Sequence, residues 1–592
     1  MNIKSNLLKS VALSSLLFSA VTANAQFSSL NPADFSVPSW TKLCRMANAL
    51  QDGNQPYSIN MTINGDPRSR MGFAWFTNKS VTNGVVQLVA KADAKESDFN
   101  TPQLVFNATS TDVDNLNYSI DRNNLEGITP NQKVSYRSHK ALAVGLTPNT
   151  TYSYRVGSEN GWSEIGHFTT APSTSKAFSF IYITDTQAQN DEMFNVSQQT
   201  VHVARNLNPD AAFLLCNGDL VETSGSSNSE WEYEQWFETM QDVWLDCPLV
   251  VAQGNHDKSS NSNFAHHFNT DNSYNSSASV HTAMNGTVYS FVRGDVLFMV
   301  INYEDWNTPG YLTSLADWMR AQVNNNPNAK WRIATYHKNM FTGSKSHQDD
   351  QDGKAVREAM LPIFSELDIH IALQGHDHIY EVIGPVNNAD KTLLEDKVEH
   401  VTLVSGGERE NMTGKTGGTF HVGEGTLYFL NNSAGRKKYE PRNEDAMENS
   451  LSKHGVENYW SLFSGKFGQT GEPTFSRVDV DGDNIHIATY TVDSDGLPHL
   501  FDEFDVVNDD MSTSPTALST NPADNVKITL ANGVVNVSGI NPDTIELFSL
   551  SGVKEAEIAN SNSLVIINQP KGIYVVRAIS GNDMYTTKIT ID

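Results

Sequence analysis

Four short polar segments constrain the fold of this chain most strongly, because each of them directly follows an apolar run. The runs have the length and composition of short buried strands, so we predict a strand ahead of each segment. A fifth predicted strand, Trp331–Tyr336, ends at His337. The four pairs are Phe178–Thr184 before Asp185-Thr186-Gln187, Ala211–Cys216 before Gly218-Asp219, Pro248–Ala252 before Gly254-Asn255-His256-Asp257, and Ile369–Leu373 before Gly375-His376-Asp377-His378.

Stretches with the apolar spacing of helices separate the predicted strands. They are Met193–Leu207, Trp231–Trp244, Leu312–Val323 and Val356–Leu367. Alternation of strands and helices predicts a mainly parallel sheet. Because ligands of such sheets bind beyond the carboxyl ends of the strands, we expect all five polar segments to converge there.

Length and charge limit the class of protein. With 592 residues the chain is too long for a single hydrophobic core, so several domains are expected. The net charge of −27 argues against nucleic acid as the main partner, because phosphate backbones are held chiefly by Lys and Arg. A small phosphorylated substrate stays open, since bound divalent cations would reverse the potential locally.

The N-terminal residues have the pattern of an export signal. Lys4 and Lys9 precede a mainly apolar stretch, Val11–Val21, and Ala23-Asn24-Ala25 is a small-residue cleavage site. We therefore expect a signal peptide over 1–25 and a mature chain that begins at Gln26. The stretch is too short to span a bilayer, and no later segment approaches ~20 apolar residues. The expected location is outside the cytoplasm: secreted, at the cell surface or in the periplasm.

Three cysteines, Cys44, Cys216 and Cys247, stand at unrelated spacings. They indicate neither a disulfide framework nor a thiolate metal site. For Cys216 and Cys247 we expect two buried thiols, with a single disulfide as the alternative.

Changes in pattern along the chain predict the domain boundaries. Short alternating runs separated by turn residues indicate a β-sandwich over 57–172. A polar, nonperiodic linker over 508–522 separates the catalytic-type domain from further β patterns. The predicted parts are a signal peptide over 1–25, an N-terminal segment over 26–56, a β domain over 57–172, an α/β domain over 173–507, a linker over 508–522 and a C-terminal β-sandwich over 523–592.

Two of these parts resemble known domains. The run Leu146–Val156 followed by Phe168–Pro172 resembles the end of a fibronectin-III-type domain, whose relatives precede the catalytic domain of purple acid phosphatases. The last segment, which ends Thr587-Lys588-Ile589-Thr590-Ile591, resembles the C-terminal sorting domains of the type IX secretion system in Bacteroidetes. That resemblance implies secretion machinery as a partner, and a plain accessory β domain is the alternative.

The polar segments supply nearly every ligand that a two-metal hydrolytic site requires. Two divalent metals ~3.5–4 Å apart need one carboxylate that bridges them and oxygen or nitrogen donors around it. Asp219 is the obvious bridge.

The order of the segments, D-x-[H/Q/G], G-D, G-N-H-[D/E], H and G-H-x-H, resembles the signature of the calcineurin-like metallophosphoesterase superfamily. The resemblance implies an α/β domain of two mixed sheets flanked by helices. It also implies that Asp185, Gln187 and His378 hold one metal, that Asn255, His337 and His376 hold the other, and that Asp219 is shared.

The same resemblance assigns roles to residues that bind no metal. His256 faces the substrate and stabilises the phosphoryl group or protonates the leaving oxygen. Asp257 orients the turn or the site indirectly. His347, ten residues after His337, stands where relatives carry substrate-facing histidines; a surface-loop histidine is the alternative.

Two positions depart from the purple acid phosphatase pattern. That subfamily has Gly where this chain has Gln187, and a metal-binding Tyr where this chain has Glu222. Gln187 can restore a neutral oxygen ligand, while Glu222 is either a supporting residue near the site or a solvated loop residue. Since the phenolate ligand is absent, we expect no charge-transfer colour with ferric iron.

These observations predict an exported binuclear-metal phosphoesterase that hydrolyses phosphate monoesters by attack of a metal-bound hydroxide. The metals would be two divalent or mixed-valence ions drawn from Fe, Zn, Mn and Mg. A phosphodiesterase or nucleotide hydrolase on the same site is one alternative. A noncatalytic surface-binding protein is another, and the full ligand set argues against it.

Overall fold

The computed structural model divides into two compact units, Met1–Asp509 and Asp510–Asp592. It describes Met46, residues 54–509 and residues 526–591, apart from 175–176, 224–228, 259–262, 271–281, 348–349, 390–391, 394–397, 400–416, 442–465, 532, 550–553, 567–568 and 581–582. The predicted signal peptide, Cys44 and most of the predicted linker lie outside the described residues. Cys216 and Cys247 are buried free thiols, so the disulfide alternative is wrong.

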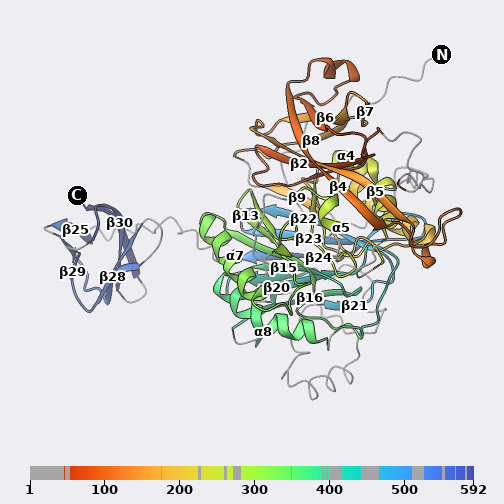
Figure 1. Ribbon diagram of the computed structural model, residues 1–592. Coiled ribbons are helices and arrows are strands. Elements are labelled where there is room, and N and C mark those ends of the chain that lie inside the picture. The colour runs from red at the N-terminus through yellow and green to blue at the C-terminus, as the bar shows by residue number, and fades with distance from the viewer. Residues whose placement is uncertain are drawn as a thin grey trace, which may run out of the picture. The chain divides into compact units, whose positions relative to one another are not determined.

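The first unit begins with an antiparallel β domain, at the top of the unit in Figure 1. Aromatic side chains hold its layers together, for example Phe73 with Tyr154 at a ring-centroid distance of 4.8 Å. Its strands are β1 (Tyr57–Thr62), β2 (Arg70–Thr77), β3 (Val85–Val89), β4 (Leu104–Asn117), β5 (Lys133–Val144), β6 (Thr151–Ser158), β7 (Gly161–Trp162) and β8 (Gly166–Thr169). The sequence pattern missed β4, because most of its residues are at least partly exposed and few are apolar.

Two mixed sheets form the core of the α/β domain. In the first, β9 (Phe178–Ile183), β10 (Leu214–Cys216) and β11 (Leu249–Val251) are parallel to one another. The antiparallel strands β22 (Thr474–Asp481), β23 (Asn484–Val492) and β24 (Pro498–Asn508) extend it, with β19 (Thr419–Val422) and β18 (Val398–Glu399) beyond them. At its other edge β11 pairs with β1, which joins the N-terminal β domain to this sheet.

The second sheet contains the other chemically important strands. Its parallel strands are β13 (Val296–Val300), β14 (Trp331–Lys338), β15 (Ile371–Gly375) and β20 (Thr426–Asn431). Antiparallel neighbours are β12 (Tyr289–Arg293), β16 (Tyr380–Asn387), β17 (Thr392–Leu393) and β21 (Lys466–Gly468). The predicted strands fall into two mixed sheets, as the resemblance implied, and the expectation of one mainly parallel sheet was wrong.

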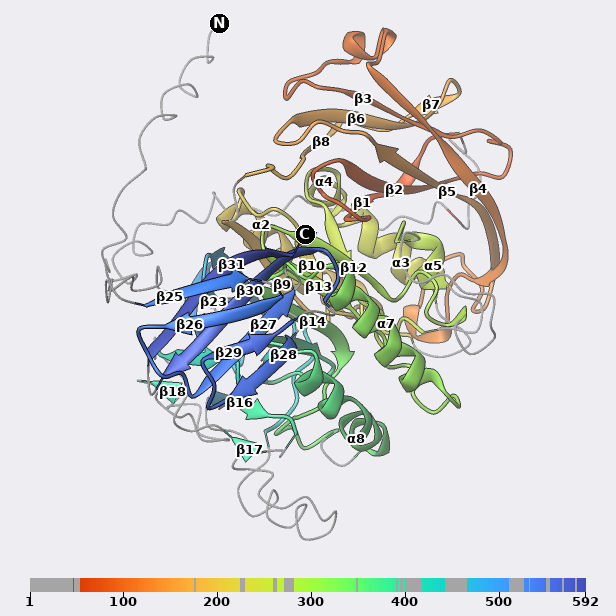
Figure 2. The same ribbon diagram turned by 90° about the vertical axis from the view of Figure 1, so that its left-hand side faces the viewer.

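The two sheets pack face to face, and helices cover their outer faces. Ring contacts cross between the sheets, such as Phe180 on β9 with Phe298 on β13 at 5.6 Å. Helices α7 (Tyr311–Asn325) and α8 (Gln351–Glu366) lie side by side and share a buried apolar cluster with the second sheet (Figure 2). Buried side chains of α2 (Asp191–Leu207), α3 (Glu230–Glu238), α4 (Gln241–Asp246) and α5 (Asn263–His267) pack in a second cluster with the first sheet.

One predicted helix is divided. The apolar spacing over Trp231–Trp244 predicted a continuous helix, whereas α3 and α4 are separate, with Thr239 and Met240 between them. No helix among the described residues is long and apolar enough to cross a membrane.

The second unit consists of two antiparallel sheets around one small buried cluster. One contains β25 (Lys527–Ala531), β26 (Val534–Ser538) and β29 (Ser563–Val565). The other contains β27 (Thr544–Ser549), β28 (Lys554–Ala559), β30 (Gly572–Ser580) and β31 (Asp583–Ile591). The two-sheet arrangement agrees with the β pattern of the sequence, and the sorting role stays a prediction.

Candidate metal centre

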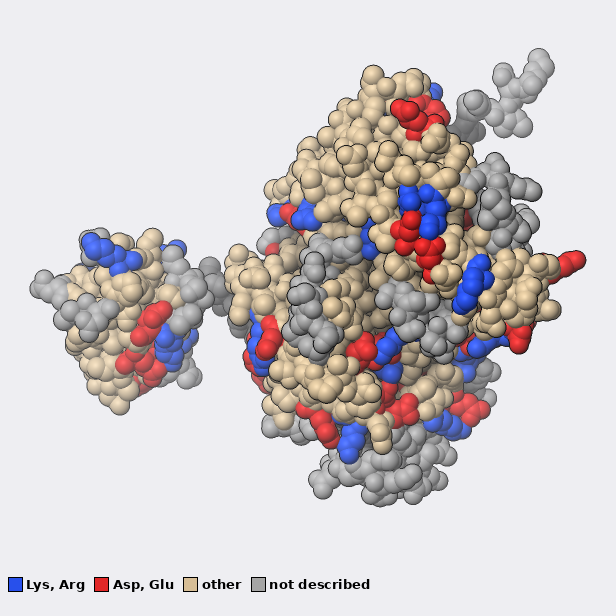
Figure 3. Space-filling view, in the orientation of Figure 1, with Lys and Arg blue, Asp and Glu red and all other residues tan. Residues whose placement is uncertain are grey.

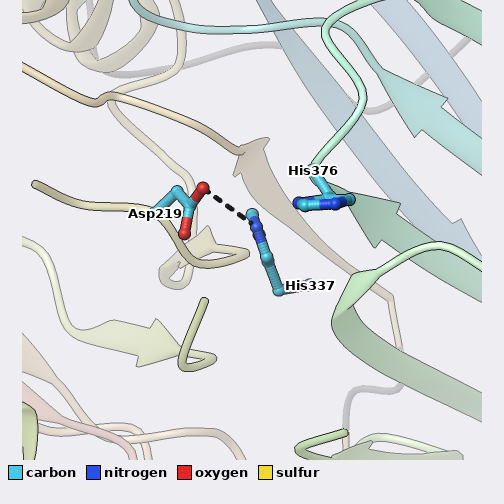
Figure 4. A group of neighbouring side chains, drawn as sticks. All are labelled: Asp219, His337 and His376. Atoms are coloured by element: carbon cyan, nitrogen blue, oxygen red, sulfur yellow. Dashed lines mark ion pairs between the residues drawn. The ribbon is translucent and has the colours of Figure 1, made fainter. Parts of the chain in front are cut away.

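The polar segments converge because both sheets present the carboxyl ends of their parallel strands to the same region. Asp219 follows β10, His337 lies near the end of β14, and His376 follows β15 (Figure 4). Donor atoms of these three side chains all lie within 4.8 Å of one another. Strands from two separate sheets thus build one cluster of potential metal ligands.

Asp219 is the centre of this cluster. Its side chain is 2% exposed, and its Oδ2 lies 3.1 Å from His337 Nε2. The same oxygen accepts a hydrogen bond of 2.7 Å from Gln187 Nε2. The other oxygen, Oδ1, accepts one of 2.8 Å from the backbone N–H of His256. A carboxylate contacted from several directions in this way is suitably placed to be shared between two cations.

Asp185 and His378 form one side of the centre. His378 Nε2 lies 3.1 Å from Asp185 Oδ1. The other carboxylate oxygen of Asp185 accepts hydrogen bonds from the backbone N–H of His376, at 3.0 Å, and from the hydroxyl of Thr184, at 2.6 Å. These bonds fix the carboxylate beside the imidazole, so the pair is preorganised.

His337, Asn255 and His376 form the other side. His337 Nε2 lies 3.1 Å from Asn255 Oδ1, and the rings of His337 and His376 are 5.2 Å apart. His337 Nδ1 lies 2.9 Å from the backbone carbonyl of Asn217. Since a carbonyl only accepts, Nδ1 carries the proton, and Nε2 directs its lone pair toward the centre when the ring is neutral. Sequence reasoning missed Asn217, because a residue that acts through its backbone leaves no side-chain motif.

All seven predicted ligands are therefore linked by a continuous chain of contacts around Asp219. They are Asp185, Gln187, Asp219, Asn255, His337, His376 and His378.

Unusual backbone geometry accompanies these residues. Asp185, Asp219 and His376 have φ angles of 55°, 50° and 77°, in the left-handed region that residues other than Gly seldom adopt. Such conformations cost on the order of 1–3 kcal/mol each and cluster at functional sites. Gly254 is also required by packing, since a Cβ there would collide with the carboxylate of Asp219.

The donor set fits two divalent cations. Carboxylate and amide oxygens with imidazole nitrogens are the ligands of such ions in proteins. Two buried donors, Gln187 Oε1 and His378 Nδ1, have no hydrogen-bond partner among the described residues. Buried polar atoms without hydrogen-bond partners are costly in a closed core. A bound metal ion would offer a ligand position to the Gln187 amide and the His378 ring.

The pKa values of the two histidines His337 and His376 also favour a bound cation. Burial disfavours a charged imidazole, yet the carboxylates of Asp219 and Asp185 outweigh burial and raise the pKa of His337 to about 10. Burial and the neighbouring His347 and His337 rings hold the pKa of His376 well below its usual value. Without a cation, a proton on His337 thus compensates the buried carboxylates, and a divalent ion would displace that proton.

His256 lies at the more open side of Asp219. Its side chain is 19% exposed, and its Nε2 is 3.9 Å from Asp219 Oδ2. Its Nδ1 contacts the backbone carbonyl of Glu222, which makes Nδ1 the donor in that pair. The ring is therefore oriented by backbone, with Nε2 on the side of the centre.

Asp257 has a supporting position. Its carboxylate accepts hydrogen bonds from the backbone N–H groups of Gly254, at 2.9 Å, and Leu220, at 3.0 Å. Burial and the charge of Asp219 raise its pKa to about 8. It thus ties together the two loops that carry Asp219 and Asn255.

The two alternatives for Glu222 are resolved by its surroundings. Its side chain is 8% exposed and lies 2.7 Å from the Lys437 ammonium group. Glu222 is therefore not a solvated loop residue. Its backbone orients His256, and its side chain fixes the segment that contains Lys437.

That segment, residues 433–440, was missed by sequence reasoning. It is anchored at the first ligand, since Ser433 Oγ and Gly435 N donate to the backbone carbonyl of Asp185. Tyr439 stacks on the His378 ring with a centroid distance of 4.3 Å and an interplanar angle of 14°. It is also 5.6 Å from His347. No motif marks a tyrosine so far along the chain from the ligands.

His347 lies at the rim of the centre. Its ring is 4.1 Å from that of His376, its side chain is 26% exposed, and its Nδ1 lies 2.7 Å from Asp350 Oδ2. This contact places the His347 ring against a proposed ligand, and its role toward a substrate stays a prediction.

Two parts of the chain match known protein families. Residues 56–170 match the family described as Purple acid Phosphatase, N-terminal domain, and residues 178–380 match Calcineurin-like phosphoesterase. The chain is 26% identical over 205 residues to purple acid phosphatase 18 of Arabidopsis thaliana, covering 34% of this chain and 45% of that one. It is 25% identical over 199 residues to the bovine (Bos taurus) serine/threonine-protein phosphatase CPPED1, covering 32% of this chain and 60% of that one.

A solved structure shares the fold. The purple acid phosphatase PPD1 from yellow lupin (Lupinus luteus) superposes with a TM-score of 0.53 at 15% identity, covering 77% of this chain and 75% of that one. The chain spans roughly half the length of the curated relatives it matches. The prediction of the superfamily is confirmed: residues 178–380 form a calcineurin-like phosphoesterase domain, and the N-terminal domain of purple acid phosphatases precedes it over residues 56–170.

Proposed function

We propose that this chain is an exported, metal-dependent phosphoric ester hydrolase that acts on small phosphate monoesters at a binuclear centre. The observation that carries the proposal is the cluster of Asp219, His337 and His376, whose donor atoms lie within 4.8 Å of one another. Further contacts link this cluster to Gln187, Asn255 and the Asp185–His378 pair. Asp185, Gln187 and His378 would hold one cation, Asn255, His337 and His376 the other, and Asp219 both. The relatives named as phosphatases support the same class of reaction.

Bound cations would supply charge neutralisation on the phosphoryl oxygens and a nucleophilic oxygen at neutral pH. The residues of the chain supply the rest. The carbonyl of Glu222 orients His256, so that Nε2 can donate to a phosphoryl oxygen or to the leaving oxygen. His347 contacts both the His376 ring and the Tyr439 ring beside the metal centre. These two side chains would limit the shape of the ester that can reach the centre.

A substrate panel tests the function. The full chain is assayed with p-nitrophenyl phosphate, bis-p-nitrophenyl phosphate, ATP and a phosphoserine peptide, each with Mn, Zn, Fe or Mg and with a chelator. We expect the monoester to be cleaved at least tenfold faster than the diester, and chelation to abolish cleavage. Faster cleavage of the diester or of ATP would favour the phosphodiesterase or nucleotide hydrolase. A lack of cleavage with every metal would favour the noncatalytic protein.

The charge distribution supports a small substrate. On the face shown in Figure 3, acidic and basic side chains of the described residues are interspersed and form no broad basic surface. Together with the net charge of −27, this argues for a substrate held by local cations rather than by a basic patch.

Replacing Tyr439 tests its contact with His378. Tyr439→Ala should weaken metal binding severalfold, because a stacked ring pair contributes roughly 0.5–1.5 kcal/mol and here holds a ligand in place. Tyr439→Phe keeps the ring and is the matched control, with binding close to that of wild type. The dissociation constants are measured by competition with a chromophoric chelator. Equal losses in both variants would mean that the hydroxyl, and not the stacking, is what matters.

The visible spectrum tests the absence of a phenolate ligand. With Glu222 at the position of the metal-binding Tyr, the ferric-loaded protein should show no intense visible band, and other divalent metals should support activity. Tyr380 is excluded as a substitute, because its hydroxyl donates to Asp502 at 2.6 Å. Tyr439 is the described tyrosine whose mutation tests this prediction, because its ring stacks on the proposed ligand His378. A strong purple band that is lost in Tyr439→Phe would contradict the prediction.

Export is proposed from the sequence pattern at the N-terminus. Expression of the full chain in a Gram-negative host should yield a protein outside the cytoplasm that begins at Gln26. N-terminal sequencing of that fraction checks the cleavage site. A chain that keeps residues 1–25 and stays in the cytoplasm would contradict the proposal. Fusion of residues 523–592 to a reporter would separate a sorting domain, which directs the reporter to the surface, from an accessory domain.

A further inference from the structure

A cavity of 440 Å³ lies between the N-terminal β domain and the α/β domain. Its walls include Arg68 from the β1–β2 connection, Pro172 from the end of the β domain, and Phe291 and Arg293 from β12. A volume of this size is in the range of small-molecule sites. Both matched domains thus contribute to one cavity.

The cavity is remote from the metal centre. Arg293 pairs with Val296 at the start of β13, and Val296 pairs with Trp331 at the start of β14. His337 lies six residues further along β14, which corresponds to about 20 Å of strand. The cavity therefore lies at the edge of the second sheet where its parallel strands begin, and the metal centre at the edge where they end.

Arg293 contributes a basic side chain to the cavity. No described residue pairs with its guanidinium group, and its Nε is buried without a hydrogen-bond acceptor among the described residues. The guanidinium carbon of Arg293 lies 5.3 Å from the centre of the Phe178 ring. Burial lowers its pKa to about 10, and it remains charged at neutral pH. A guanidinium presents five donors in a planar fork that matches a carboxylate or phosphate.

The other groups in the cavity narrow the choice of anion. Arg68 is committed to Asp66 through Nε and Nη2, each at 2.9 Å. Asp66 and Asp295 also line the cavity and would repel a doubly charged phosphate. Phe291 and Val292 offer apolar surface beside the guanidinium. This combination suits a single negative charge on an apolar body.

We propose that this cavity binds a small organic carboxylate, with the carboxylate on Arg293 and the apolar part against the β12 wall. The site is distinct from the metal centre and does not depend on the reaction proposed for it. The buried Nε of Arg293, without an acceptor among the described residues, is the feature that favours an anionic ligand, because a buried polar atom without a hydrogen-bond partner is costly.

Calorimetric titration of the full chain with phenylacetate tests the proposal, with phenylacetamide as the uncharged isostere. We expect saturable binding of phenylacetate at one site per chain and at least tenfold weaker binding of the amide. Arg293→Gln should weaken phenylacetate binding at least tenfold. Arg320→Gln is the matched control, with a change below threefold, because Arg320 pairs with Glu366 and Asp317 outside the cavity.

Hydrolysis of p-nitrophenyl phosphate should change less than twofold in both variants, which distinguishes this cavity from the metal centre. If Arg293→Gln does not fold, Arg293→Lys keeps the charge without the fork and should bind several times more weakly than wild type. Equal binding of acid and amide, or phenylacetate binding that persists in Arg293→Gln, would overturn the proposal. Tighter Arg293-dependent binding of phenylphosphonate than of phenylacetate would overturn the assignment to a carboxylate.

Discussion

Asn255→Ala and His376→Ala should each remove most of the hydrolytic activity and reduce the bound metal below that of wild type. Asn255 Oδ1 lies 3.1 Å from His337 Nε2, and the His376 ring is 5.2 Å from that of His337, so each variant leaves the same cation short of a ligand. Loss of one cation removes charge neutralisation from the phosphoryl group, which a remaining single ion cannot replace. Metal content is measured by elemental analysis alongside the rate.

The control is a histidine outside the centre. His499 is 57% exposed and pairs with Asp493 in a surface turn, so His499→Ala should keep both metal equivalents and the full rate. Circular dichroism of all three variants checks that the fold is intact. Two full metal equivalents in both Asn255→Ala and His376→Ala would refute the ligand assignment. A rate that falls with metal content, and recovers at high metal concentration, is the expected result.

The sequence placed the proposed ligands in one region because the motif residues are fixed by backbone geometry as well as by chemistry, and their assignment to metals stays a prediction. The Gly of G-N-H is needed because the Asp219 carboxylate leaves no room for a Cβ at Gly254. The Gly of G-H-x-H is needed because a Cβ at Gly375 would meet the Thr184 hydroxyl. Because these steric requirements demand glycine, the sequence shows glycines with the potential metal-binding residues at fixed distances after them.

The sequence could not predict contacts that depend on the packing of distant segments. Tyr439 contacts His378 because residues 433–435 bind the backbone of Thr184 and Asp185, and no periodicity encodes that path. For a similar reason, the alternation of strands and helices could not divide the strands between two sheets. Apolar runs predict buried strands, but whether β10 and β14 pair or face each other is decided by tertiary packing.

The division of α3 from α4 shows the same limit. Trp231, Trp236 and Trp244 are all fully buried and lie in the stretch whose apolar residues predicted one helix. The stacking of Trp236 on Trp244, at 4.6 Å and 18°, is instead achieved across a break at Thr239 and Met240. Apolar spacing records which residues are buried and does not record a change of direction between them.

His256→Ala should retain both metal equivalents and lose turnover by about 10²-fold or more, the usual effect of removing one donor to a transferring group. The ring Nε2 lies 3.9 Å from Asp219 Oδ2, whereas the backbone N–H of His256 donates to Asp219 Oδ1 at 2.8 Å. The substitution removes the imidazole and keeps that backbone bond, so the ligand geometry should survive. Steady-state kinetics and elemental analysis on the same preparation separate the two effects.

The comparison with His347→Ala completes the test of His256. His347 packs on His376 and is paired with Asp350, so its loss should act mainly on KM and cost less in kcat than the loss of His256. A transition-state donor lowers kcat when it is removed, whereas a residue that shapes the pocket raises KM. A wild-type kcat in His256→Ala together with a large fall in His347→Ala would transfer the donor role to His347. Loss of metal in His256→Ala would instead show that the residue supports the ligands, because the electrostatic role requires an intact pair of cations.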